Sequence, residues 1–342
     1  MNDTGHERHL DGWRGISILL LLSGHFALLP TIAGHYLYTG RLGVECFFVL
    51  SGRLMAEILF VRATPLDKFY WRRVSRVFPA LWLFVLAMLM ATAAWPWLGV
   101  HPVAALTAVT FTLNYLPAEA GVAGNIWSLC VEEHAYVILT IATILCRHFD
   151  VSPIKILGAL AAVCMLNGAF QTLMLHRDYY QVYWHSDVRM ASVFVSAALY
   201  LRFRNTPFHP AIAPAAAMAG CAVSLLGSVP DVVKYSLGTS LLAFSLVILP
   251  TTWAFVLSML GSRVLTYFGI WSFSLYLWQQ PFVGREPRIG LLAAAAVLAL
   301  GSFYAVERPA RAFLNRQYAA VLGRVRWLHS RQEQLELAPP NT

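Results

Sequence analysis

The chain has 342 residues, of which 58% are hydrophobic and 12% charged, and its net charge is +8. A soluble domain has about 25% charged residues, so this composition excludes an ordinary water-soluble globular protein and favours one embedded in a bilayer. The basic residues lie in short clusters between apolar segments, which suits lipid head groups and argues against nucleic acid as a partner. The five cysteines show no CxxC spacing, so neither a disulfide framework nor a metal site is expected.

Eleven apolar segments follow one another along the chain. A helix needs about 20 apolar residues to cross the hydrocarbon core of a membrane. Seven segments run for 18 residues or more without a charged side chain: 15–38, 77–100, 156–175, 210–229, 235–260, 264–283 and 289–306. Four others are shorter or contain charges: 42–61, 102–118, 126–146 and 188–201. The pattern predicts an all-α, polytopic membrane helix bundle.

The basic clusters predict how this bundle is oriented. Cytoplasmic loops of membrane proteins carry an excess of Lys and Arg, so the cluster at 62–76 and the C-terminal tail are placed in the cytoplasm. This placement predicts about ten spans with both termini cytoplasmic, while segment 102–118 is re-entrant or interfacial. Residues 1–314 are expected to form one membrane domain, and 315–342 a polar, basic tail that is cytoplasmic and poorly ordered.

The first apolar segment carries an arginine and a histidine on one face. Arg14 and His25 are separated by eleven residues, almost three helical turns, or about 16 Å along the axis. Asp11, three residues before Arg14, can pair with it. A histidine can take a proton from a hydroxyl or carry an acyl group on its imidazole. The alternative is that His25 bonds to a neighbouring helix and Arg14 only reaches the membrane surface.

Two further clusters follow in chain order. In the second apolar segment, Glu45 and Arg53 are interpreted as a structural ion pair, among small residues that permit close helix packing. At the start of the third, guanidinium groups that can bind phosphates lie beside Tyr70 and Trp71, although such a cluster also occurs as ordinary positive-inside anchoring. These guanidinium groups belong to Arg72, Arg73 and Arg76.

A fourth cluster places two carboxylates and a histidine in the segment 126–146, at Glu132, Glu133 and His134. Glu132 and Tyr136 lie on one helix face at a spacing of four residues. A carboxylate at this depth could orient a sugar hydroxyl or adjust the properties of a histidine. The alternative is a buried ion pair with a basic residue.

Together these clusters resemble the acyltransferase-3 family of membrane O-acyltransferases, because six of its motifs occur in order over essentially the whole chain. In chain order they are Leu10-Asp-Gly-Trp-Arg-Gly-Ile with His25; Phe47-Phe-Val-Leu-Ser-Gly52; Arg72-Arg-Val-Ser-Arg76; Trp127-Ser-Leu with Glu132 and Tyr136; Phe273-Ser-Leu-Tyr-Leu-Trp278; and Val306-Glu-Arg-Pro309. The chain departs from the family at Gln279, where related sequences often have His, at Arg53, which replaces an apolar residue, and at Glu45, where Asp is common.

The resemblance implies an enzyme of the bacterial cytoplasmic (inner) membrane. Its donor would be acyl-CoA, usually acetyl-CoA, arriving from the cytoplasm as a co-substrate, with no permanently bound cofactor. Its acceptor would be a sugar hydroxyl of a surface polysaccharide, a lipopolysaccharide or a lipid-linked precursor. Three alternatives stay open: an acyltransferase for a small natural product such as a macrolide, a proton-coupled sugar or lipid transporter, and a structural or regulatory membrane protein. The oligomeric state is not indicated.

The resemblance also assigns roles to the clustered residues. His25 would be the general base or the acyl carrier, and Arg14 would hold the pantetheine arm or polarise the thioester carbonyl. Glu132 and, less strongly, Glu133 would position the acceptor or His25. The residues expected to bind substrate are Asp11, Arg72, Arg73, Arg76, Trp127, Ser128 and Tyr136.

Overall fold

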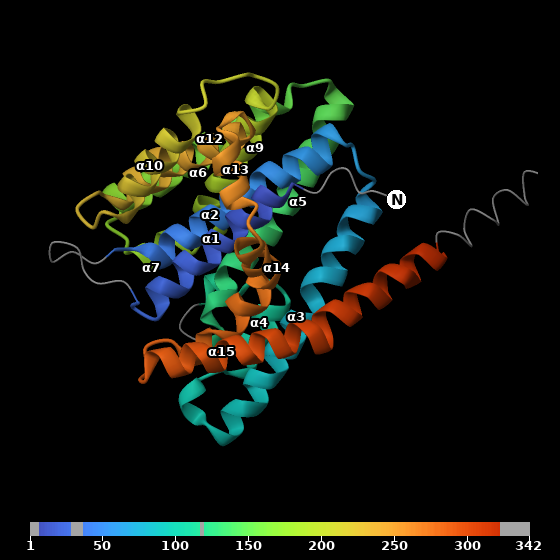
Figure 1. Cartoon of the computed structure of the whole chain (residues 1–342), viewed down its shortest axis with the longest axis vertical. Coiled ribbons are helices and arrows are strands. Elements are labelled where there is room, and N and C mark those ends of the chain that lie inside the picture. The colour runs from blue at the N-terminus through green and yellow to red at the C-terminus, as the bar shows by residue number, and fades with distance from the viewer. Residues whose placement is uncertain (1–6, 29–36, 117–119, 322–342) are drawn as a thin grey trace, which may run out of the picture.

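A computed structural model describes residues 7–28, 37–116 and 120–321 of the chain. Within these ranges the chain forms helices and turns and contains no strand, which confirms the predicted all-α class (Figure 1). The α-helices are α1 (Arg8–His25), α2 (Thr39–Ala56), α3 (Leu66–Ala94), α4 (Pro102–Val109), α5 (Trp127–Phe149), α6 (Pro153–Leu173), α7 (Tyr179–Tyr183), α8 (Ser186–Arg189), α9 (Ala191–Phe203), α10 (Ile212–Leu225), α11 (Asp231–Val233), α12 (Thr239–Ile248), α13 (Ala254–Leu260), α14 (Arg263–Trp278) and α15 (Arg288–Ser302).

Among the described residues, five helical stretches are long and apolar enough to cross a membrane: Leu66–Ala94, Gly121–Phe149, Pro153–Leu173, Asp231–Thr251 and Arg288–Val321. Helices α13 and α14, bent by 48° at a short break, make a sixth if they act as one span. The predicted number of about ten spans is therefore not confirmed. Helices α1 and α2 have 18 residues each but carry three Asp, Glu, Lys or Arg side chains apiece, which lowers their hydropathy.

The described part of the segment 102–118, residues 102–116, contains one short α-helix. Helix α4 has eight residues, so it is about 12 Å long, whereas the hydrocarbon core of a membrane is about 30 Å thick. It begins at a proline and ends at Val109, before a short 3₁₀ turn at Leu113–Tyr115. An element of this length does not cross the bilayer alone, in agreement with the prediction that this segment is not a span.

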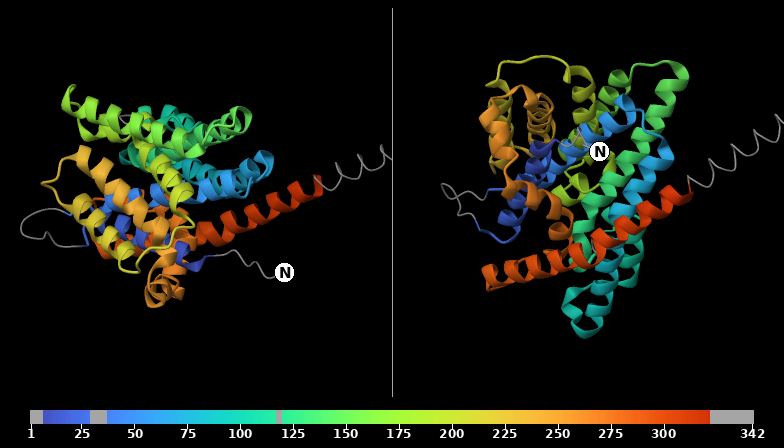
Figure 2. Two further views of the ribbon diagram at one scale, coloured as in Figure 1. Left: turned by 90° about the horizontal axis from the view of Figure 1, so that it is seen from above. Right: turned by 45° about the vertical axis from the view of Figure 1, so that its right-hand side comes forward.

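The last helix continues beyond the expected end of the membrane domain. It runs through a π-helical turn to Val321, so residues 315–321 of the predicted tail are helical, and 322–342 lie outside the described residues. The indole Nε1 of Trp71, near the start of α3, donates a hydrogen bond of 3.1 Å to the carbonyl oxygen of Leu314. Figure 2 shows this helix running along the bundle and projecting beyond it.

Helix α1 lies at the centre of the bundle, between α2 and α14 (Figure 1). Glycines allow the backbones to approach closely there: a Cβ on Gly15 would lie 2.2 Å from the carbonyl oxygen of Leu265 in α14. A Cβ on Gly43 of α2 would lie 2.5 Å from the carbonyl oxygen of Ser17. Neither contact leaves room for a side chain, so the axial position of α1 is fixed by its neighbours on both sides.

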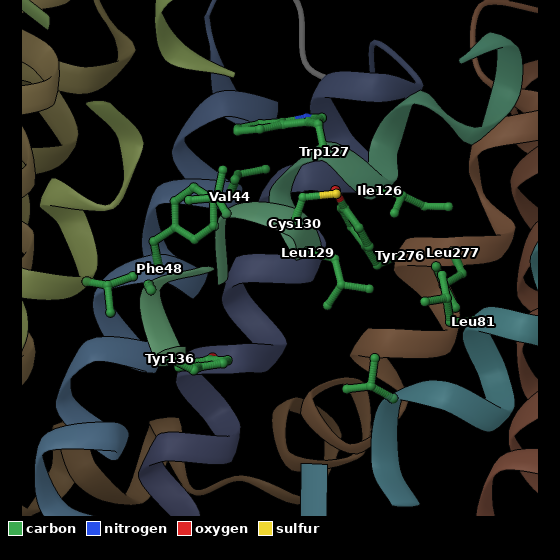
Figure 3. Close-up of a cluster of buried hydrophobic side chains, with 14 of the residues drawn as sticks. Val44, Phe48, Leu81, Ile126, Trp127, Leu129, Cys130, Tyr136, Tyr276 and Leu277 are labelled. Atoms are coloured by element: carbon green, nitrogen blue, oxygen red, sulfur yellow. The ribbon is translucent and has the colours of Figure 1, made fainter. Parts of the chain in front are cut away.

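The apolar core forms where four helices meet around the candidate site (Figure 3). Phe48 of α2, Leu81 of α3, Leu129 of α5 and Leu277 of α14 are all buried within it. Because the side chains on these faces are apolar and closely packed, the polar groups between them are held in a poorly solvated setting.

Candidate functional site

One cavity, called here the arginine cavity, has a volume of about 120 Å³ and lies where α1, α2, α3, α5 and α14 meet. Much of its remaining lining is apolar and comes from α2 and α14. The predicted site residues that the structure brings together around it are Arg14, Arg73, Arg76, Ser128, Glu132 and Tyr136. Residues from three motifs that are far apart in the sequence therefore share one cavity.

Arg73 is already engaged by acidic partners. Its Nη2 and Nε donate hydrogen bonds of 2.7 Å and 3.1 Å to Oε1 of Glu133, and its Nη2 lies 3.9 Å from Oε2 of Glu132. Its guanidinium also lies 3.6 Å from the ring centre of Tyr136. Two carboxylates neutralise this arginine, so it is poorly suited to the phosphate-binding role expected of it.

Glu132 lies beside the arginines and not beside the histidine. Its Oε1 accepts a hydrogen bond of 2.6 Å from the hydroxyl of Ser51, which extends the ion-pair network to α2. His25 lines a different cavity that Glu132 does not reach. The structure thus joins Glu132 and Glu133 to a basic residue, which was the alternative interpretation of these carboxylates.

Arg14 forms the predicted pair with Asp11. Its Nη1 lies 2.5 Å from Oδ1 of Asp11, which is buried at 5% exposure. Arg14 also lines a neighbouring cavity of about 180 Å³, together with Arg62, so its guanidinium lies between two hollows. Arg72 is exposed near the start of α3 and does not line the arginine cavity, whereas Arg76 does. Of the three arginines that line the arginine cavity, Arg73 is paired with Glu132 and Glu133, whereas Arg14 and Arg76 are not.

His25 is the last residue of α1, and its ring is oriented by a glutamine. Its Nδ1 lies 3.0 Å from Oε1 of Gln279, whose side chain is completely buried after the end of α14. With the amide oxygen facing the ring, Nδ1 carries the proton and donates it to Gln279. This tautomer leaves Nε2 as a lone-pair acceptor. Nε2 lies 3.5 Å from the position a Cβ would take on Gly40, which itself lines the cavity that His25 faces.

His25 opens into a second cavity of about 540 Å³, called here the histidine cavity. Aromatic rings form much of its lining. Trp127 of the Trp-Ser-Leu motif stacks on Trp184, with ring centres 5.3 Å apart and planes 4° from parallel. The guanidinium of Arg41 lies 3.5 Å from the ring centre of Tyr179. This volume lies within the range of roughly 300–1,000 Å³ that is usual for small-molecule sites.

Val44 and Tyr276 line both cavities, so they form the partition between them. The Tyr276 hydroxyl is 2.7 Å from the hydroxyl of Ser128 and also donates to the carbonyl oxygen of Asn125. Figure 3 shows Trp127 and Tyr136 at opposite ends of the buried cluster, with Val44 and Tyr276 between them. A thin layer of side chains therefore separates the arginine cavity from the histidine cavity.

The charges of the second apolar segment are structural, but their partners differ from the expected pair. Glu45 accepts a hydrogen bond of 2.6 Å from Thr239, and its Oε2 lies 2.6 Å from Nη2 of Arg189. Arg53 pairs with Glu7 at 2.7 Å. The side chains of Glu45 and Arg53 are both buried, which explains why a charge of opposite sign lies beside each of them.

Sequence reasoning did not single out Arg41, Arg189 or Tyr276 as site residues. Arg189 lies within an apolar segment, so its charge was a usable signal. Arg41 directly precedes an apolar segment and resembles an ordinary interface residue. Tyr276 belongs to a recognised motif, but only the fold places it against Ser128 and between two cavities.

The fold and the two adjoining cavities define a polytopic helical membrane protein with a buried polar site. The acyltransferase domain model matches residues 7–284, and the chain therefore belongs to the acyltransferase-3 family. The peptidoglycan O-acetyltransferase OatA of Listeria monocytogenes is 23% identical over 363 residues, covering 90% of this chain and 56% of that protein. The O-acetyltransferase OatA of Staphylococcus aureus is 25% identical over 210 residues, covering 56% of this chain and 34% of that protein.

The chain spans between a third and somewhat more than half of the length of the curated relatives it matches. No solved structure matches it.

Proposed function

We propose that this protein is an integral membrane O-acyltransferase that moves an acyl group, acetyl in the first instance, from acyl-CoA to a sugar hydroxyl. The acceptor sugar would belong to a surface polysaccharide or to a lipid-linked precursor of one. One observation carries the proposal: a cavity with arginines and a cavity with a histidine adjoin across Val44 and Tyr276. Family membership and the names of the relatives support the same chemistry.

The arginine cavity is proposed to receive the thioester end of the donor. Arg14 and Arg76 supply positive charge beside an otherwise largely apolar lining, where a hydrogen bond to a thioester oxygen is stronger than in water. Arg72, exposed near the start of the same helix as Arg76, would bind the phosphates of CoA. Arg73, held by its two glutamates, would shape the cavity and would not bind the donor directly.

The histidine cavity is proposed to hold the acceptor. Nε2 of His25 would take the proton of the sugar hydroxyl while the oxygen attacks the acyl carbon. The carbon–sulfur bond then breaks, and the thiolate of CoA takes that proton from the imidazolium. The alternative, in which the imidazole carries the acyl group between the cavities, uses the same nitrogen. In both routes the acyl group must pass the partition formed by Val44 and Tyr276.

The test uses the full chain in liposomes with radiolabelled acetyl-CoA, together with mass spectrometry of surface glycans from cells with and without the gene. A mass gain of one acyl group on a defined glycan is expected, and His25→Ala should abolish it while the protein still inserts. Full acetyl transfer by His25→Ala at normal membrane abundance would refute the proposal. Sugar flux without consumption of acetyl-CoA would instead identify a transporter, and acylation of a small natural product would identify that class of acceptor.

A further inference from the structure

The histidine cavity contains a cation, Arg41, that has no role in the acyl-transfer steps proposed above. Arg41 lines this cavity, and its guanidinium lies 3.5 Å from the ring centre of Tyr179 and 4.5 Å from that of Tyr38. Contact with ring faces leaves the N–H groups of a guanidinium directed outward in its own plane. Among the described residues, the Arg41 side chain donates no hydrogen bond, and its ion-pair partner is Asp231, 3.7 Å from Nη1. The other N–H groups of Arg41 are therefore available to a bound molecule.

In the described part of the chain, the positive charge around Arg41 is only partly balanced by acidic side chains. The carboxylate of Asp231 lies 3.7 Å from Nη1 of Arg41 and 3.5 Å from Nζ of Lys234. Lys234 is buried at 3% exposure and lies 4.5 Å from the ring centre of Tyr38. Two cations therefore share one carboxylate, which leaves one positive charge beside a partly enclosed cavity. An excess positive charge in such a setting is unfavourable and favours the binding of an anion.

The rest of the cavity suits a sugar ring. Trp184 is partly exposed and stacks on the buried Trp127, so the pair presents aromatic surface to the cavity, on which the C–H face of a pyranose can pack. The volume of about 540 Å³ is sufficient for one or two sugar units. His25, with Nε2 as a proton acceptor, lines the same cavity. One cavity thus combines an aromatic surface, a cation and a base.

We propose that the histidine cavity is a subsite for an acidic saccharide, whose ring packs on Trp127 and Trp184 and whose carboxylate or phosphate pairs with Arg41. The inference rests on the proposed function in that the same molecule would present its hydroxyl to His25. It narrows the acceptor class, because a neutral sugar would leave the excess positive charge of Arg41 and Lys234 over Asp231 uncompensated, and a cationic natural product would be repelled by both residues.

The test measures binding of three matched disaccharides to the purified full chain in lipid nanodiscs by calorimetry at low salt. The probes are cellobiose, cellobiouronic acid and cellobiose phosphate. Both acidic probes, or one of them, should bind about tenfold or more tightly than cellobiose, as expected for a charge-assisted hydrogen bond. The tighter of the two identifies whether carboxylate or phosphate is the recognised group.

The variant Arg41→Gln should lower affinity for the acidic probes to that for cellobiose and leave cellobiose binding unchanged. Arg41→Lys keeps the charge and should retain part of the preference for the acidic probes. This variant shows that a loss of preference in Arg41→Gln is not caused by a loss of fold. Arg62→Gln removes an exposed arginine that lies outside this cavity and should change nothing. Equal binding of all three probes by the unaltered protein, binding of none, or an unchanged preference in Arg41→Gln would each overturn the inference.

Acetyl transfer, assayed separately, distinguishes this inference from the proposed function. Transfer to neutral and acidic acceptors at equal rates would refute the acidic-saccharide subsite and leave the acyltransferase proposal standing. Selective binding of an acidic probe without any transfer from acetyl-CoA would refute the acyltransferase proposal and leave the subsite standing.

Discussion

The contact between His25 and Gln279 gives a sharp test of how the proposed base is prepared. Gln279→Met removes the acceptor that lies 3.0 Å from Nδ1 while keeping a side chain of similar length. In the proposed reaction His25 becomes an imidazolium, so this hydrogen bond strengthens from about 1 kcal/mol in the ground state to about 1.5–3 kcal/mol in the transition state. Only the difference of about 0.5–2 kcal/mol affects the barrier, and about 1.36 kcal/mol is tenfold in rate, so kcat should fall about 2- to 30-fold.

The same substitution should have little effect on folding. Nε2 of Gln279 is buried and has no hydrogen-bond partner among the described residues, so replacing the amide by a thioether also removes an unsatisfied polar group. The melting temperature should therefore change little. The KM for acetyl-CoA should also stay near its original value, because Gln279 does not line the arginine cavity.

The assay is acetyl transfer in liposomes with kcat and KM determined separately, alongside thermal unfolding in detergent. Gln279→His is the matched control, since a second imidazole can accept the Nδ1 proton and should preserve more activity than methionine does. An unchanged kcat in Gln279→Met would refute the reasoning that Gln279 orients His25. A fall in kcat that is matched by a large fall in melting temperature would assign the residue a purely structural role.

Two further predictions concern charges away from the histidine. Arg73→Met leaves the partly buried carboxylates of Glu132 and Glu133 without their cation. It should destabilise the protein by up to about 3 kcal/mol and lower its abundance in the membrane, measured by thermal unfolding and immunoblotting. Glu7 precedes α1, and a hydrogen bond with His9 is the main reason that its pKa is lowered to about 2. Because the pKa of Glu7 is lowered, its carboxylate stabilises the fold when the pH is above the ordinary pKa of 4.5, and this contribution is lost as the pH falls toward 2. Comparing the unfolding of Glu7→Gln with that of the unaltered protein between pH 2 and 7 measures this contribution.

Each of these predictions has a contradicting outcome. Adding Glu133→Gln to Arg73→Met should restore part of the stability, because one unpaired carboxylate is removed, and no recovery would argue against the ion pair. For Glu7, the difference in stability between the two proteins should shrink as the pH falls. A difference that stayed constant over the whole range would show that the carboxylate has no special stabilisation in the folded state.

Several features of this protein follow from the amino-acid sequence alone. The long apolar segments require helices, because a backbone in lipid must satisfy its own hydrogen bonds, and the structure is helical throughout the described residues. The spacing of Asp11 and Arg14 within one helix determined that they pair, and they do. The order of the motifs determined the family, which the domain match confirms.

The tertiary structure decided which polar residues meet. Glu132 was expected near His25, yet it binds Ser51 and lies beside Arg73, because α3 and α2 face it across the arginine cavity. Glu45 pairs with Arg189 and not with Arg53, since α9 packs on α2 and Arg189, the last residue of α8, lies just before α9. Hydropathy and spacing describe one helix at a time, and the pairing of buried charges depends on which helix faces are in contact. The separation into two cavities, with Arg14 at one and His25 at the other, arises only from that packing.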